Sequence, residues 1–154
     1  MKLSHLLTPE LIKVGLENST KEKIIQELID IVVAQGLVSD TDQAFMDVMS
    51  RELQQSTGLE AGIAVPHGKS TSVDQLVGAL GISEEGIDFA SLDGKPSHLF
   101  FLLIAPPNMS GPHVRALANI AKFSQNSRYR NMLTEASSSE EAYRIIKQAE
   151  TEDI

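Results

Sequence analysis

A run of six apolar residues, 99–104 (LFFLLI), constrains the fold more than any other segment of this 154-residue chain. The run is aliphatic and aromatic throughout, and prolines follow at positions 106 and 107. A short, uninterrupted apolar run that ends at turn residues is typical of a strand buried on both faces. We therefore predict a central strand here, in a sheet that is covered on both sides.

The rest of the chain alternates between strand-like and helix-like segments. Strands are expected at residues 11–16, in the run that ends at Pro66, and at 76–82, with an edge strand at 86–89. Apolar residues at helical spacing predict helices after Ser19, after Asp40 or Thr41, from His113 onward, over 128–136 and after 138. This alternation predicts a single α/β domain over residues 1–154, with a mixed, mostly parallel sheet sandwiched between helices.

The predicted helices have definite ends and buried faces. Ser19 and Glu22 have the spacing of a capping box, so Ser19 is expected to begin the first long helix. The buried stripe of the second helix is expected to extend to Leu53. Residues 108–112 are expected to form a loop, and the helix that starts at His113 is expected to bury Val114.

Composition excludes several classes of function. The chain has no cysteine, which rules out disulfides, thiolate catalysis and zinc–thiolate sites. Its formal charge of −8 argues against binding to nucleic acid and is compatible with docking to a basic protein surface. No apolar stretch approaches the roughly 18 residues of a membrane span, and the start does not resemble a signal peptide, so a cytoplasmic protein is expected. No glycine pattern for nucleotide binding is present, so no cofactor is expected.

His67 is the first candidate functional residue. It follows Pro66 in the run 62–68 (GIAVPHG), where the expected strand stops. Ligand sites in open α/β sheets lie beyond the carboxyl ends of strands, and Pro66 fixes the direction in which the next side chain leaves the backbone. A neutral imidazole is a nucleophile near pH 7. The alternative is a loop histidine that caps backbone groups.

His113, Arg51 and Thr57 are the other candidates. His113 would open a helix after the central strand, where N–H groups favour an anion, and would face His67 if the two strands are neighbours. Arg51 could bind phosphate oxygens through two parallel bonds, and Thr57 could add a hydroxyl. The alternatives are a half-buried histidine, an arginine that complements a helix dipole, and a turn threonine. No carboxylate near the histidines has clear metal-ligand spacing, so no metal is expected.

These residues resemble the enzyme IIA domain of the fructose/mannitol type (EIIA type 2), from the bacterial phosphoenolpyruvate-dependent sugar phosphotransferase system. The same family includes the nitrogen-regulatory IIA proteins. The resemblance rests on the segments 51–52 (RE), 56–58 (STG) and 62–68 (GIAVPHG), with His113 as a second matching histidine. It extends along the chain through 86–89 (GIDF) and 93–96 (DGKP).

The resemblance implies that His67 accepts a phosphoryl group on Nε2 from the phosphocarrier HPr, or from a nitrogen-type HPr, and passes it to a IIB domain for sugar uptake. Arg51 would neutralise the phosphoryl oxygens and His113 would donate a hydrogen bond to them. Such a phosphotransferase needs neither metal nor cofactor, and would meet the membrane only peripherally, through a IIB/IIC permease. Glu60 departs from the family pattern and would place a negative charge in the active loop.

Two other hypotheses remain open. The chain could be a regulatory module whose phosphorylation state controls other proteins by binding, as the nitrogen-type members do. It could also be a catalytically silent protein that binds an anion or a metal.

Overall fold

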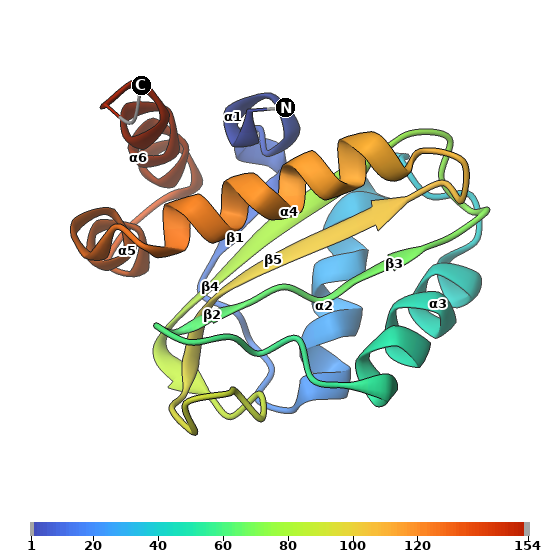
Figure 1. The fold of residues 1–154 in the computed structure, drawn as a ribbon, viewed down its shortest axis with the longest axis horizontal. Coiled ribbons are helices and arrows are strands. Elements are labelled where there is room, and N and C mark those ends of the chain that lie inside the picture. The colour runs from blue at the N-terminus through green and yellow to red at the C-terminus, as the bar shows by residue number, and fades with distance from the viewer. Residues whose placement is uncertain (1, 153–154) are drawn as a thin grey trace.

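The computed structural model describes residues 2–152, and Figure 1 shows a sheet with helices on both faces. The helices are α1 (Leu3–Leu6), α2 (Lys21–Ala34), α3 (Thr41–Gln54), α4 (Ser110–Ser124), α5 (Ser127–Thr134) and α6 (Ser139–Glu152), with a 3₁₀ turn, η1, at Pro9–Leu11. The strands are β1 (Ile12–Val14), β2 (Ile63–Ala64), β3 (His67–Lys69), β4 (Val77–Ile87) and β5 (Ser97–Ala105). The predicted fold class, a sheet sandwiched between helices, is confirmed.

The sheet is mixed, with β5 in its interior. Its strand order is β1-β4-β5-β2, and β3 also pairs with β5. The β1–β4, β2–β5 and β3–β5 pairs are parallel, whereas β4 and β5 are antiparallel. The sheet is therefore mostly parallel, as predicted, and the apolar run 99–104 is its central strand.

Alternation along β5 explains why helices cover both faces. The odd-numbered residues of the run 99–104 belong to a core shared with α1, α4, α5 and α6. The even-numbered residues belong to a second core shared with α2 and α3. Successive strand residues point to opposite faces, so a strand that is apolar at every position is stable only between two apolar layers.

The strand that leads into Pro66 ends at Ala64, as predicted, but pairing with β5 resumes at His67, which the sequence did not predict. Ile63 pairs with Leu99 in β2, and His67 pairs with Leu103 in β3, so both segments keep one register along β5. Proline has no N–H, so Pro66 interrupts the ladder for a single step, while its carbonyl still accepts from the N–H of Leu103 at 3.1 Å. His67 therefore lies within an edge segment of the sheet.

The first long helix and two strands also have boundaries that differ from the prediction. Thr20 rather than Ser19 caps α2, and its hydroxyl accepts from the N–H of Lys23. β1 is shorter than the predicted strand over 11–16, because Pro9–Leu11 forms the 3₁₀ turn. β4 continues past residue 82, through a register irregularity, to Ile87, so residues 86–87 of the predicted edge strand at 86–89 are the end of β4 and residues 88–89 lie outside any strand.

Helix α4 begins at Ser110, earlier than predicted. Pro112 lies in its first turn, where backbone N–H groups have no intrahelical partner, so it does not break the helix. The buried face also differs from the prediction, because Val114 is 62% exposed while its neighbour His113 is 6% exposed. Leu53 of α3, at 80% exposed, likewise lies outside the core in which it was expected.

Candidate functional site

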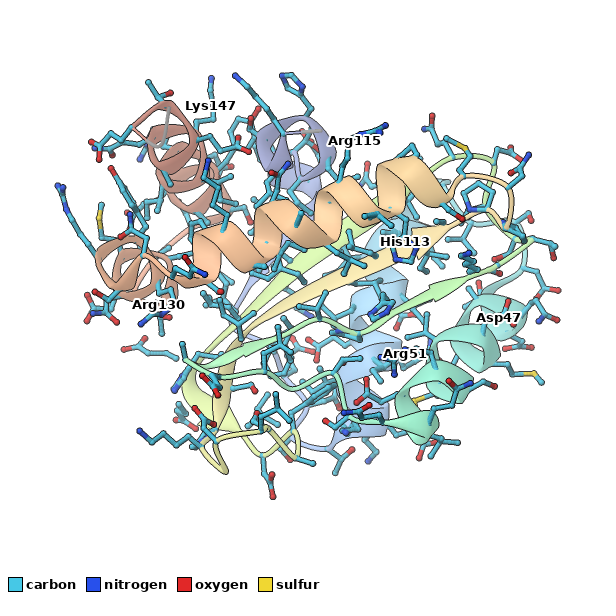
Figure 2. The ribbon with its side chains drawn as sticks, viewed as in Figure 1. Asp47, Arg51, His113, Arg115, Arg130 and Lys147 are labelled. Carbon is cyan, nitrogen blue, oxygen red and sulfur yellow. The ribbon has the colours of Figure 1, made fainter. Side chains whose placement is uncertain are left out.

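A pocket of about 300 Å³ opens at the β3 edge of the sheet, between α3 and α4. It brings together three of the four residues singled out from the sequence, Arg51, His67 and His113. Figure 2 shows Arg51 on α3 and His113 on α4, on opposite sides of β3. The complete lining consists of Asp47, Ser50, Arg51, Gln54, His67, Gly68, Lys69 and His113.

The side chains of β3 point alternately toward α4 and toward α3. His67 and Lys69 share the α4 side of the strand, whereas Gly68 faces α3. A Cβ at Gly68 would lie 3.2 Å from the carbonyl oxygen of Asp47 and 3.3 Å from the Cα of Val48. The missing side chain therefore lets the backbone of α3 approach β3, and this approach brings the end of α3, with Arg51, to the pocket.

His67 has a fixed ring orientation. Its Nδ1 lies 2.8 Å from the carbonyl oxygen of Val65, and because a carbonyl can only accept, Nδ1 carries the proton. In the neutral ring Nε2 is then the unprotonated nitrogen. Burial lowers the pKa of His67 below its ordinary value, the Val65 hydrogen bond opposes this, Arg51 lowers the pKa further, and Glu52 raises it. The ring is therefore neutral, and nucleophilic at Nε2, at pH 7.

His113 lies beside His67, as expected if the strands that precede the two histidines were neighbours. The two ring centroids are 5.4 Å apart, and the planes meet edge to face at 72°. His113 is buried, and its Nε2 has no hydrogen-bond partner within residues 2–152. Burial, and then the charges of His67 and Lys69, lower the pKa of His113. An unpaired buried polar atom costs about 1–3 kcal/mol, so this atom marks a place where a ligand group would be stabilising.

Two cations flank the histidines. Arg51, in the last turn of α3, donates from Nη1 to the carbonyl oxygen of Gln55 at 2.9 Å, which leaves its other N–H groups available. The expectation that Arg51 complements a helix end is thus compatible with a role in the pocket. Lys69 donates from Nζ to Ser110 Oγ at 3.1 Å, at the start of α4. Sequence reasoning missed Lys69, although period-two alternation from His67 would have indicated it.

Thr57 and Glu60 are not among the residues that line this pocket. Thr57 is buried, its hydroxyl donates to Glu52 Oε1 at 2.5 Å, and its backbone N–H donates to Glu52 Oε2 at 2.8 Å. Glu60 is exposed and lines two other pockets, one of which it shares with Asp93 and Lys95. The structure therefore buries Thr57 away from the pocket lining and places Glu60 at the surface, outside the pocket.

Residues 2–152 contain no group of three histidine, cysteine, aspartate or glutamate side chains arranged to hold a metal ion. In the same part of the chain, no helix is long and apolar enough to cross a membrane.

The fold and the site together define an α/β protein with two histidines and two cations around a pocket of about 300 Å³. The sequence matches the family described as "Phosphoenolpyruvate-dependent sugar phosphotransferase system, EIIA 2" over residues 5–149, and the chain belongs to this family. The resemblance stated from the sequence is thereby confirmed.

Relatives of two kinds are similar to this chain. A fructose-specific EIIABC component from Bacillus subtilis is 36% identical over 96% of this chain, which spans 23% of that protein's length. A fructose-specific EIIA component from Haloferax volcanii is 33% identical over 91% of this chain and 92% of its own. The crystal structure of nitrogen regulatory protein IIA-Ntr from Neisseria meningitidis superposes with a TM-score of 0.84 at 30% identity, covering 94% of this chain and 98% of that one.

The complex of enzyme IIAMTL with phosphorylated enzyme IIBMTL from Escherichia coli contains a chain of the same fold. It has a TM-score of 0.78 at 21% identity, and the match covers 90% of this chain and 95% of that one.

Proposed function

We propose that this protein is a phosphocarrier in which His67 accepts a phosphoryl group on Nε2 from an HPr-type carrier and passes it to a IIB domain for sugar uptake. The observation that carries the proposal is the bond between His67 Nδ1–H and the carbonyl of Val65. This bond reserves Nε2 as the nucleophile in a pocket that also contains Arg51 and His113.

Transfer between two imidazoles has a simple balance of bonds. The P–N bond of the donor phosphohistidine breaks, its electron pair returns to the donor ring, and His67 Nε2 forms the new N–P bond. His67 keeps its Nδ1 proton, so positive charge develops on the ring, and the Val65 carbonyl stabilises that charge. Arg51 and Lys69 compensate the phosphoryl charge, and Nε2–H of His113 donates to a phosphoryl oxygen.

Exposed apolar side chains on α3 and α4, the two helices that flank the pocket, would suit docking by a protein. Met46, Leu53 and Val114 are 60%, 80% and 62% exposed, and each is the sequence neighbour of a residue that lines the pocket. The chain's charge of −8 favours a partner with a basic surface.

The test is incubation with phosphoenolpyruvate, enzyme I and either a sugar-type or a nitrogen-type HPr, followed by measurement of acid-labile phosphate. We expect His67→Ala to abolish the label and His113→Ala to slow transfer in a folded protein. His5→Ala and His98→Ala are matched controls, because neither residue lines the pocket, and both should keep the label. Label that persists on the His67→Ala protein would refute the proposal.

A nitrogen-regulatory role is the second candidate. It is favoured by the Neisseria meningitidis protein, which matches this chain over almost its whole length. In that case phosphorylation of His67 would control binding to target proteins instead of supplying a sugar permease. Phosphorylation by a nitrogen-type HPr without transfer to any IIB domain would support regulation, whereas rapid transfer to a fructose-type IIB domain would support transport.

A further inference from the structure

The carboxylate of Glu52 is buried directly behind the pocket. We propose that Glu52 is a positioning residue which, through Thr57 and Val65, holds His67 in the tautomer and orientation that phosphoryl acceptance requires. This proposal rests on the proposed role of His67 as the acceptor. It assigns a function to a side chain that the transfer chemistry does not itself use.

Glu52 follows Arg51 in the last turn of α3, and its side chain is 1% exposed. Both of its oxygens are occupied. Oε1 accepts from the Thr57 hydroxyl at 2.5 Å, and Oε2 accepts from the Thr57 N–H and from Lys21 Nζ, each at 2.8 Å. A buried carboxylate is costly unless it is paired and hydrogen-bonded, so these contacts fix Thr57 firmly against α3.

A continuous series of contacts leads from Thr57 to the imidazole. The carbonyl of Thr57 accepts from the N–H of Val65 at 3.0 Å, and the carbonyl of Val65 accepts from His67 Nδ1–H at 2.8 Å. The segment around Gly58 runs antiparallel to Ala64, which keeps these two backbones in register. Glu52 therefore fixes the carbonyl that selects the His67 tautomer, while the same helical turn presents Arg51.

The other end of this network is anchored in the core. Lys21 Nζ, at the start of α2, also donates to Ser56 Oγ at 3.0 Å and lies 4.6 Å from the centre of the Phe89 ring. Ser56 Oγ in turn donates to the carbonyl of Phe89 at 2.8 Å. The ion pair thus joins α2, α3 and the 55–58 loop, so Glu52 cannot shift without a change in the loop that holds Val65.

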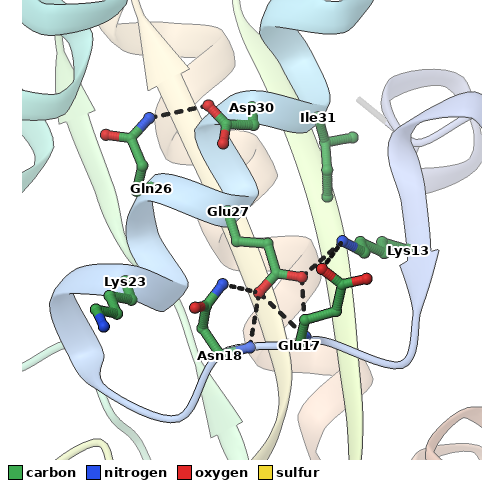
Figure 3. A pocket seen from close by; sticks show the side chains of 8 residues that line it. All are labelled: Lys13, Glu17, Asn18, Lys23, Gln26, Glu27, Asp30 and Ile31. Atoms are coloured by element: carbon green, nitrogen blue, oxygen red, sulfur yellow. Dashed lines mark hydrogen bonds and ion pairs between the residues drawn. The ribbon is translucent and has the colours of Figure 1, made fainter.

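A second buried carboxylate provides a matched control. Glu27 of α2 accepts from the N–H groups of Glu17 and Asn18 at 3.0 and 3.1 Å, from Asn18 Nδ2 at 2.8 Å, and forms an ion pair with Lys13 at 2.7 Å (Figure 3). Its chemistry matches that of Glu52, but none of its contacts leads to His67. A role limited to stability would make the two carboxylates equivalent.

The experiment compares Glu52→Gln, Thr57→Val, Thr57→Ser and Glu27→Gln. Glu52→Gln keeps the shape but places an amide donor against Lys21 or Thr57, and Thr57→Val removes the hydroxyl. Nitrogen-15 NMR of the histidine rings in the unphosphorylated protein reports the His67 tautomer and pKa. Transfer kinetics from phosphorylated HPr report the rate constant separately from half-saturation by the donor.

We expect Glu52→Gln and Thr57→Val to raise the Nε2–H population of His67 and to lower the transfer rate constant by about tenfold to a hundredfold, with half-saturation unchanged. Thr57→Ser keeps the hydroxyl and should therefore have the wild-type tautomer of His67 and the wild-type rate constant. Glu27→Gln should lose stability while retaining the wild-type tautomer and rate constant. A wild-type tautomer in the Glu52→Gln protein, or an equal effect of Glu27→Gln, would overturn the proposal. Because the NMR measurement uses unphosphorylated protein, it decides the positioning role even if wild type accepts no phosphate.

Discussion

A single methyl group at Gly68 tests how closely α3 must approach β3. The added Cβ of Gly68→Ala would lie 3.2 Å from the Asp47 oxygen and 3.3 Å from the Asp47 carbonyl carbon and the Val48 Cα. All three neighbours are backbone atoms, so relief requires α3 to move away by a few tenths of an ångström. Overpacking of this kind costs about 1–3 kcal/mol.

The same displacement would carry Arg51 away from His67, because Arg51 lies one turn after Val48 in α3. A misplacement of about 1 Å can cost a hundredfold in rate, so a shift of a few tenths of an ångström should cost severalfold. Urea denaturation measures the loss of stability, and the rate of phosphorylation by phosphorylated HPr measures the loss of function.

Gly111→Ala is the matched control, since the nearest side-chain atom to its Cβ is Arg115 Nη1 at 3.4 Å, an ordinary contact. It should leave stability unchanged or slightly raised, because alanine is the better helix former. If Gly68→Ala keeps both the wild-type unfolding free energy and the wild-type rate, then α3 does not depend on close contact with β3, and the account of the pocket is wrong.

Three further predictions concern the charges in the pocket. Because burial lowers the pKa of His67 and His113, phosphoryl acceptance should persist below pH 6.5 and fall only as the pH drops through the folded pKa of His67, as a pH series of initial rates would show. The histidines of the unfolded chain titrate at about pH 6.5, so at lower pH the unfolded chain binds more protons than the folded one. The unfolding free energy should therefore decrease as the pH falls below about 6.5, and the decrease should be smaller in the His113→Ala protein. Arg51→Lys should slow transfer more than tenfold, because a lysine cannot form two parallel bonds to phosphoryl oxygens, and Lys69→Gln should slow transfer less. A wild-type rate in the Arg51→Lys protein would contradict the role of Arg51.

The sequence predicted the layers of the fold well because each of the long elements has an unambiguous pattern. The run 99–104 is apolar at every position, which is typical of a strand between two helical layers. Two of the failures arose at proline, whereas others concerned the cap of α2 and the buried faces of α3 and α4. The sequence did not predict that pairing resumes at His67 or that α4 includes Pro112, because each proline removes only one N–H that the local structure can spare. Whether that N–H is needed depends on pairing partners that are distant in the sequence.

The grouping of Arg51, His67 and His113 was predictable because all three lie at the ends of elements that meet at one edge of a sheet. The role of Thr57 was harder to predict from the sequence, because a hydroxyl beside a glycine suggests a ligand equally well in a loop or in a buried network. What decides its environment is Glu52, which the apolar stripe of α3 gave no reason to place inside. The stripe pattern favoured Leu53 for that position.

Two pairs of neighbouring residues show which faces of the flanking helices α3 and α4 turn toward the pocket. In α3, Glu52 is 4% exposed and Leu53 is 80% exposed, and in α4 the values are 6% for His113 and 62% for Val114. Both helices thus turn a polar residue inward and an apolar residue outward, at a cost in stability that transfer chemistry and docking would justify. It follows that Leu53→Ser and Val114→Ser should change the unfolding free energy by less than about 0.5 kcal/mol, since neither side chain is in the core. Both changes should raise the HPr concentration needed for half-saturation, whereas an unchanged value would show that these exposed apolar side chains do not contact the donor.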